Sequence, residues 1–265
     1  MSERTNCWGD DVAYDYNEIV SDLNALLRLR ATIVGMKRFR SEDELKAIPK
    51  LRRPPADEKF ATDQIVGQSR WHGTTLGITM DNLIGAQCGA VVGLYPRNDD
   101  FLQGKQLAGV WFEAGGDAAA HQQGMSCASY GDYAALAVSP LTSERLGNPD
   151  ICLIYATPGQ MILFINGLQW SGYKKLSFTC VGESSCADSW GNALKTGEPS
   201  VSIPCYAERR FGGVQDDEML MAIPPSYLPK VVAGLKALSR NGLRYPIPNL
   251  GLTTSPEVAL KKSYG

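Results

Sequence analysis

The chain has 265 residues, 44% of them hydrophobic and 20% charged, and its 26 Lys and Arg nearly balance its 28 Asp and Glu. This composition is ordinary for a globular protein, and the length allows one large core or two closely packed ones. Because the basic residues form no stripe and the apolar stretches are short, we expect neither a nucleic-acid nor a membrane partner. The first residues also lack the apolar segment of a signal peptide, so we expect a cytoplasmic protein.

The N-terminal part is predicted to contain a helix, a strand and a second, shorter helix. Asp15 and Ser41 are each followed three residues later by a Glu, which is the spacing of a capping box at a helix start. An apolar repeat at helical spacing follows Asp15. Residues 32–39, between the two helices, read as a strand.

Three segments are expected along the chain. Residues 1–55 form the N-terminal helix–strand–helix segment and a basic, proline-rich connector. Residues 56–243 form the main α/β body, continuous with the N-terminal segment as one domain, and residues 244–265 form a tail. Because strands alternate with helices, we expect an α/β (or α+β) fold with helices packed on a mixed sheet.

The middle of the chain is predicted to hold one long helix and one long loop. A helix over residues 76–91 would carry Cys88 near its apolar face. Residues 96–131 are rich in Gly and weakly periodic, and they include His121 and Cys127. A loop of this length in a compact domain is more often functional than idle.

The second half of the chain is predicted to contain further buried strands and two helices. The strands are at 133–138, 151–155 and 218–223, and the helices start at Thr157 and Ser226.

Between these elements, residues 175–205 read as a βαβ unit. The strand 175–181 is followed by a helix from Cys186 and by a second strand that ends before Cys205. Such a unit is right-handed and has parallel strands. Both cysteines would then face the crevice at the carboxyl edge of the sheet, where open α/β sheets usually bind ligands.

Short motifs follow one another in a characteristic order through this half of the chain. They are Ser139-Pro140-Leu141, Pro149-Asp150, Thr157-Pro158, Ser185-Cys186, Gly197-Glu198-Pro199, Ser202-Ile203-Pro204-Cys205 and Asp216-Asp217-Glu218. Their series, over residues 20–240, resembles the uncharacterised conserved-cysteine family catalogued as domain of unknown function 169. The resemblance implies that the cysteines matter, and it implies no established activity. Such proteins usually have Gly before the last cysteine and Gly-Arg after it, whereas this chain has Pro204 and Tyr206, which puts the function of that loop in question.

Cys186 and Cys205 are the first candidates for a catalytic site. Ser185 would cap the helix, and the macrodipole at the helix start would lower the thiol pKa of Cys186. His72 or His121 would supply the general base for a thiol nucleophile. The competing interpretation is a buried, inert thiol and a surface histidine, since Cys is among the most buried residue types.

A thiolate-bound metal or iron–sulfur cluster is the cofactor considered. Its candidate ligands are Cys88, Cys127, Cys186 and Cys205. Their wide spacing is not a metal-binding signature, and inert thiols are the alternative. The remaining cysteines are explained by a terminal position or by packing in apolar strands, namely Cys7, Cys152 and Cys180.

Arg209 and Arg210 are the candidate substrate-binding residues. They follow Cys205 in a predicted flexible loop, and a guanidinium binds a carboxylate through two hydrogen bonds. Trp190 is a candidate wall of an aromatic pocket. A solvated surface for the arginines and core packing for the tryptophan are the alternatives.

We therefore expect a soluble enzyme of lyase or hydrolase type that acts on a small anionic organic molecule, with an aromatic one as an option. Its cysteine-containing pocket would lie at the carboxyl edge of the sheet. The sequence has no nucleotide or dinucleotide motif. The alternative is a non-catalytic ligand-binding, cofactor-binding or redox-sensing protein that uses the same cysteines. A small molecule is the expected partner, and a homo-oligomer is left open.

Overall fold

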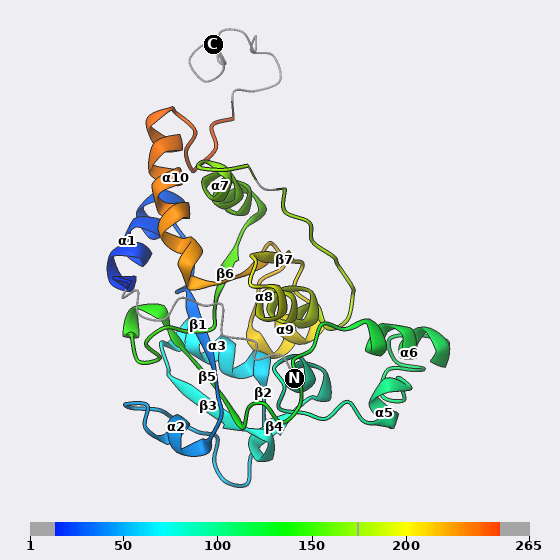
Figure 1. Cartoon of the computed structure of the whole chain (residues 1–265). Coiled ribbons are helices and arrows are strands. Elements are labelled where there is room, and N and C mark those ends of the chain that lie inside the picture. The colour runs from blue at the N-terminus through cyan, green and yellow to red at the C-terminus, as the bar shows by residue number, and fades with distance from the viewer. Residues whose placement is uncertain (1–13, 174, 250–265) are drawn as a thin grey trace, which may run out of the picture.

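The centre of the molecule is a six-stranded sheet, seen in a computed structural model that describes residues 14–249 apart from 174 (Figure 1). The strands are β1 (Val34–Phe39), β3 (Leu76–Thr79), β5 (Ala135–Pro140), β6 (Ile151–Ala156), β7 (Ser200–Ser202) and β8 (Met219–Ile223). Their order is β3-β5-β1-β6-β8-β7, and every neighbouring pair is antiparallel. Because β1 lies between β5 and β6, the N-terminal segment contributes a central strand to the same sheet as the main body.

Helices cover both faces of this sheet. One face is covered by α1 (Tyr16–Leu27), α7 (Pro158–Gln169) and α10 (Leu228–Arg240). The other face is covered by α3 (Thr62–His72), α4 (Ala86–Val91), the π-helical turn η3 (Ala187–Gly191), α8 (Asn192–Thr196) and α9 (Tyr206–Gly212), which packs on α3. The layers are therefore helix, sheet and helix.

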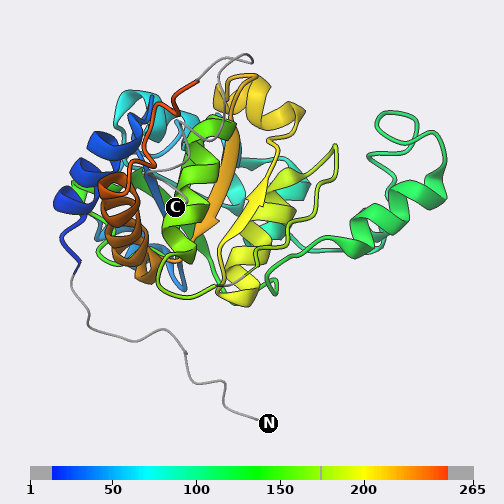
Figure 2. The same ribbon diagram turned by 90° about the horizontal axis from the view of Figure 1, so that it is seen from above.

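The remaining elements are short. They are α2 (Glu42–Lys46), β2 (Phe60–Ala61), η1 (Met80–Asn82), β4 (Leu83–Ile84), α5 (Asp99–Leu102), α6 (Gly115–Gly124), η2 (Leu141–Ser143) and η4 (Pro225–Tyr227). Strands β2 and β4 form a separate parallel pair. Figure 2 shows α5 and α6 projecting away from the layered body. Within the described residues, no helix is long and apolar enough to span a bilayer.

The alternation of side chains along β6 separates the two cores. Leu153 and Tyr155 pack with the helices around α3, whereas Cys152 and Ile154 pack with α1, α7 and α10. This is the period of two that a strand imposes on its side chains. The expected class, strands with helices packed on the sheet, is confirmed by these layers.

Helix starts follow their capping residues. The Asp15 side chain accepts a hydrogen bond from the Glu18 N–H, and Ser41 accepts one from Glu44. Thr157 and Gln160 form a complete capping box at the start of α7. The prediction that Ser226 caps the last helix is wrong, because Ser226 lies inside η4 and the residue that precedes α10 is Tyr227.

The predicted βαβ unit is wrong. Residues 175–181 form no strand, and β7 pairs with β8 in the antiparallel sense, so the sheet is not mixed. The segment runs along the outside of the molecule, where Thr179 Oγ1 and the Val181 N–H donate hydrogen bonds to the Asp188 carboxylate. Its alternation of apolar and polar residues resembles a strand, but among the described residues it pairs with no strand of the sheet.

Three further boundaries differ from the prediction. Residues 76–79 form β3, paired with β5, so the predicted long helix is reduced to α4. Gly85, with φ of +98°, separates α4 from the preceding strand β4. The long loop contains α5 and α6, and the predicted loop at Arg209 is helix α9.

Candidate functional site: a buried cluster of thiols and carboxyls

Two cysteine sulfurs meet between the helices that cover one face of the sheet. Cys88 lies on α4 and Cys186 immediately precedes η3, and their Sγ atoms are 3.2 Å apart. Cys186 is fully buried and Cys88 is partly exposed. A disulfide has an S–S distance of about 2.05 Å. The two sulfurs are therefore in contact as thiols, and a shift of roughly 1 Å would bring them to bonding distance.

A buried carboxyl adjoins this pair of thiols. Asp63 lies in the first turn of α3, is 3% exposed, and has both carboxyl oxygens 3.7 Å from Cys88 Sγ. Burial and the nearby Glu208 raise the pKa of Asp63 to about 8, although the hydrogen bond with Cys88 acts against both. Asp63 is therefore a carboxyl that gains and loses its proton near neutral pH.

Both thiols of the pair hold their protons at neutral pH. The hydrogen bond with Cys88 favours the thiolate form of Cys186, but burial and the neighbouring acidic groups together raise its pKa to about 12. The same hydrogen bond, burial and the Asp63 carboxyl raise the pKa of Cys88. The expected lowering of the Cys186 pKa at a helix start is thus wrong, because burial and nearby negative charges outweigh the helix dipole.

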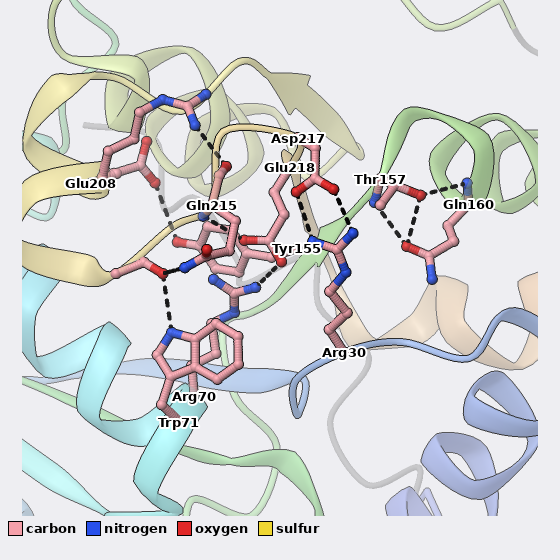
Figure 3. A network of polar contacts seen from close by, with 12 residues as sticks. Arg30, Arg70, Trp71, Tyr155, Thr157, Gln160, Glu208, Gln215, Asp217 and Glu218 are labelled. Carbon is pink, nitrogen blue, oxygen red and sulfur yellow. Dashed lines mark hydrogen bonds and ion pairs between the residues drawn. The ribbon is translucent and has the colours of Figure 1, made fainter.

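Cys205 is linked to the pair through a buried hydrogen-bond network. Its backbone N–H donates to Ser185 Oγ at 2.8 Å and to Glu208 Oε2 at 3.3 Å. Ser185 Oγ donates to one carboxyl oxygen of Glu208. Tyr155 Oη donates to the other carboxyl oxygen at 3.2 Å (Figure 3). Because Ser185 directly precedes Cys186, this network fixes the start of the helix that carries Cys186. Burial raises the pKa of both Glu208 and Cys205, while hydrogen bonds lower them.

A buried ion pair lies beside this hydrogen-bond network. Arg70 Nη2 bonds to Glu218, and both side chains are 1% exposed. The guanidinium lies 4.3 Å from the ring centroid of Tyr155 and 4.5 Å from that of Trp71 (Figure 3). This stacking orients the Tyr155 hydroxyl toward Glu208.

A close approach of two helices places Asp63 beside Glu208. Gly67 on α3 faces Gly212 on α9, and a Cβ at Gly67 would lie 2.5 Å from the Gly212 carbonyl oxygen. The helices meet at the backbone, so any side chain at Gly67 would push α9 away. Trp71 Nε1 donates to the Gly213 carbonyl at 3.2 Å and ties the other end of the contact.

Trp190 belongs to the core and not to an open pocket. It lies within η3, is 0% exposed, and packs with the cluster that includes Cys186. A π-helical turn contains an extra residue, which changes the direction of the side chains before it, and such turns are frequent at functional sites.

The histidines lie outside the thiol cluster. His72 is exposed at the C-terminal end of α3, nine positions after Asp63. His121 on α6 bonds to Glu183 at 3.1 Å, three residues before Cys186. His121 therefore contacts the segment that leads to the site.

The candidate substrate-binding residues, Arg209 and Arg210, form hydrogen bonds with residues close to them in the sequence. Arg209 donates from Nε to the Pro204 carbonyl at 3.2 Å and from Nη1 to the Gln215 carbonyl at 2.6 Å. Arg210 Nη1 donates to Tyr206 Oη at 3.3 Å on the exposed side of α9.

The other cysteines are separate from this cluster. Cys127 follows α6 and packs beside the core, and its raised pKa reflects burial opposed by Arg97 and Lys195. Cys152 faces the opposite helix layer. Cys180 is exposed, so its predicted burial in an apolar strand is wrong. Cys7 lies outside the described residues. Among the described residues, no group of three or more His, Cys, Asp and Glu side chains is arranged to hold a metal ion.

Three members of the site were not predicted from the sequence. Asp63 and Tyr155 carry no local motif and reach the thiols only through the packing of α3 and β6. Glu208 had a readable signal, because it follows Cys205 by three residues, which is the spacing of a capping box.

The fold and the site define a three-layer protein with an antiparallel sheet and a buried pair of thiols beside a carboxyl. Residues 22–234 match the model of the uncharacterised family DUF169, described as Uncharacterised ArCR. The chain belongs to this family, as the order of its motifs indicated. The matched range includes every member of the thiol and carboxyl cluster. Neither the curated proteins nor the solved structures contained a match.

Proposed function

We propose that this protein is a thiol redox protein in which Cys88 and Cys186 change between the dithiol and disulfide states. The observation that carries the proposal is the 3.2 Å contact of the two sulfurs. It corresponds to the redox-sensing alternative expected from the sequence. The cytoplasmic location is part of the proposal, because a reducing compartment would hold the resting pair as thiols.

Two observations favour this function over a lyase or hydrolase that uses a thiolate nucleophile. Such a nucleophile needs a lowered pKa and an exposed sulfur, whereas Cys186 is fully buried and its pKa is raised to about 12. The guanidiniums expected to hold an anionic substrate, Arg209 and Arg210, are engaged with neighbouring groups on α9 and its flanks.

The reaction requires an external oxidant and reductant. On oxidation the two thiols lose two protons and two electrons, and one S–S bond forms. The electrons pass to a disulfide, which is reduced to two thiols, or to a peroxide, which is reduced to water or an alcohol and water. Reduction by a dithiol reverses the change.

The test is an equilibrium titration. The protein is incubated in mixtures of reduced and oxidised dithiothreitol, quenched with acid, alkylated and mapped by mass spectrometry. We expect one disulfide, between Cys88 and Cys186, whose fraction follows the ratio of oxidised to reduced buffer as a two-electron couple requires.

Two variants make the titration specific. Cys186→Ser should abolish the disulfide, and Cys127→Ser should leave it unchanged, because Cys127 lies outside the cluster. A chain that stays fully reduced in strongly oxidising mixtures, or one that pairs Cys127 in place of Cys186, would rule out the proposed function.

A further inference from the structure

We propose that Asp63 is the acid–base group of the Cys88–Cys186 pair and moves the protons when a small hydroperoxide oxidises it. This inference rests on the proposed redox function and names the oxidant class and the residue that serves it. The geometry is direct, since both carboxyl oxygens of Asp63 lie 3.7 Å from Cys88 Sγ.

The surroundings of Asp63 indicate a chemical role. Among the described residues, the hydrogen bonds of its side chain are those with the Cys88 thiol. The nearby buried guanidinium of Arg70 is paired with Glu218. A buried carboxyl without a cationic partner costs free energy, and an apolar residue would fill the same space without that cost. The carboxyl at this position is therefore better explained by proton transfer than by stability.

The burial of the sulfurs limits the size of the oxidant. Cys186 is 0% exposed and Cys205 is 6% exposed, so an oxidant reaches the cluster through the partly exposed Cys88. To attack a disulfide, a thiolate must approach one sulfur in line with the S–S bond. A folded protein partner cannot bring its disulfide into that position at a thiol as buried as those of this cluster. A hydroperoxide reacts through two oxygen atoms and needs little more room than water.

The first step forms a sulfenic acid. The Asp63 carboxylate takes the Cys88 proton, and the Cys88 sulfur attacks the distal oxygen of the hydroperoxide, so that an S–O bond forms and the O–O bond breaks. The leaving oxygen accepts the proton from Asp63. Cys88 becomes Cys88–SOH. When the oxidant is hydrogen peroxide, its other oxygen leaves as one molecule of water.

The second step forms the disulfide. The Cys186 sulfur attacks the Cys88 sulfur, an S–S bond forms and the S–O bond breaks. Hydroxide leaves and becomes water with the proton of Cys186. Two thiols and one hydrogen peroxide thus give one disulfide and two waters, and Asp63 returns to its starting state.

The pH dependence of the first step follows from Asp63. Its pKa of about 8 lies close to neutral, where a general base is most effective. The acidic groups that interact with it are Glu208 on α9, Cys88 on α4, Glu183 before Cys186, Tyr155 on β6, and the thiols Cys186 and Cys205. The rate should rise as Asp63 loses its proton.

The experiment measures the rate of thiol loss in hydrogen peroxide between about pH 6 and pH 10. The wild-type rate should rise with an inflection near pH 8. Asp63→Asn should lose this inflection and react at least about tenfold more slowly above it, since general base catalysis contributes about 10²- to 10⁴-fold. The matched control is Thr62→Val, which removes the neighbouring buried hydroxyl on α3 and should keep the wild-type profile. This hydroxyl has no hydrogen-bond partner within the part of the chain that the structure describes.

Asp63→Glu keeps a carboxyl and should retain an inflection, which provides a second test if Asp63→Asn fails to fold. In Cys186→Ser, a sulfenic-acid probe should label Cys88. An unchanged pH profile in folded Asp63→Asn, or oxidation by an oxidised protein partner as fast as by hydrogen peroxide, would overturn the inference. If the disulfide forms in dithiothreitol mixtures but not with hydrogen peroxide, the inference fails and the redox function stands. If it forms in neither, both fail.

Discussion

At the scale of single residues, the site is a cluster of buried acidic groups whose pKa values are raised. Asp63 and Glu208 are both buried, and burial raises the pKa of each. In the unfolded chain an Asp carboxyl has a pKa of about 3.9. The folded state therefore holds a proton that the unfolded state releases over the interval between the two values.

This difference predicts that the protein loses stability as the pH rises. A carboxyl whose pKa is raised by folding lowers the free energy of unfolding from about pH 4 up to its folded pKa, about 8 for Asp63, and by no more above it. In Asp63→Asn, this decrease in the free energy of unfolding between about pH 4 and pH 8 should be smaller by on the order of a few kcal/mol. Urea denaturation at several pH values measures it, with the exposed Asp81→Asn as control. Equal slopes in Asp63→Asn and wild type would contradict the assignment.

The identity of the two contacting sulfurs could be predicted only in part from the sequence. Cys186 was singled out by its position after Ser185, and Cys88 by its place among the candidate ligands. Their contact could not be predicted, because it joins residues 98 positions apart. Asp63 shows the same limit, since its proposed role depends on Cys88, a neighbour in space, and no local sequence pattern marks it.

At the scale of elements, short sequence motifs correctly predicted where some of the helices begin. The caps at Asp15, Ser41 and Thr157 located three helices, because a capping residue and its partner lie within one turn. The strand predicted at residues 175–181 was wrong because strand formation is not local. Alternation of apolar residues suits a strand, but pairing depends on a free neighbouring strand, which the sequence does not display.

The contact between α3 and α9 provides a test of how the elements hold the site. Gly67→Ala would place a Cβ against the Gly212 carbonyl, which is backbone and cannot turn aside. We expect a loss of about 1–3 kcal/mol in the free energy of unfolding and a changed pH–rate profile, since α3 carries Asp63. Gly116→Ala on α6 is the matched control, because among the described residues nothing beyond its own chain neighbours and helix backbone lies within 4 Å of the added Cβ, and it should gain about 0.5–1 kcal/mol. Similar stabilities for the two variants would contradict the described packing.

At the scale of the whole molecule, the two states of the dithiol should differ in stability. A disulfide between Cys88 and Cys186 would close a loop across a sequence separation of 98, from α4 to η3. The chain-entropy estimate for a loop of about 100 residues is about 4.7 kcal/mol at 25 °C, as an upper value.

We therefore expect the oxidised protein to unfold at a higher denaturant concentration than the reduced protein. Guanidinium chloride denaturation of both forms, with the redox state verified by mass spectrometry, measures the difference. The oxidant should have no such effect on Cys186→Ser. Coincident midpoints for oxidised and reduced wild type would mean that strain in the native state cancels the entropic gain.

The long separation of the two sulfurs has a consequence for how the protein is made. Because Cys186 enters the chain 98 residues after Cys88, the ribosome presents one thiol of the pair well before the other exists. During that interval Cys88 can meet Cys127 and Cys152, which also precede Cys186. An oxidising environment during synthesis would trap such wrong pairs. Under the proposed redox function, the nascent chain must therefore stay reduced until the sheet has closed, because the Cys88–Cys186 disulfide can form only after Cys186 has been added.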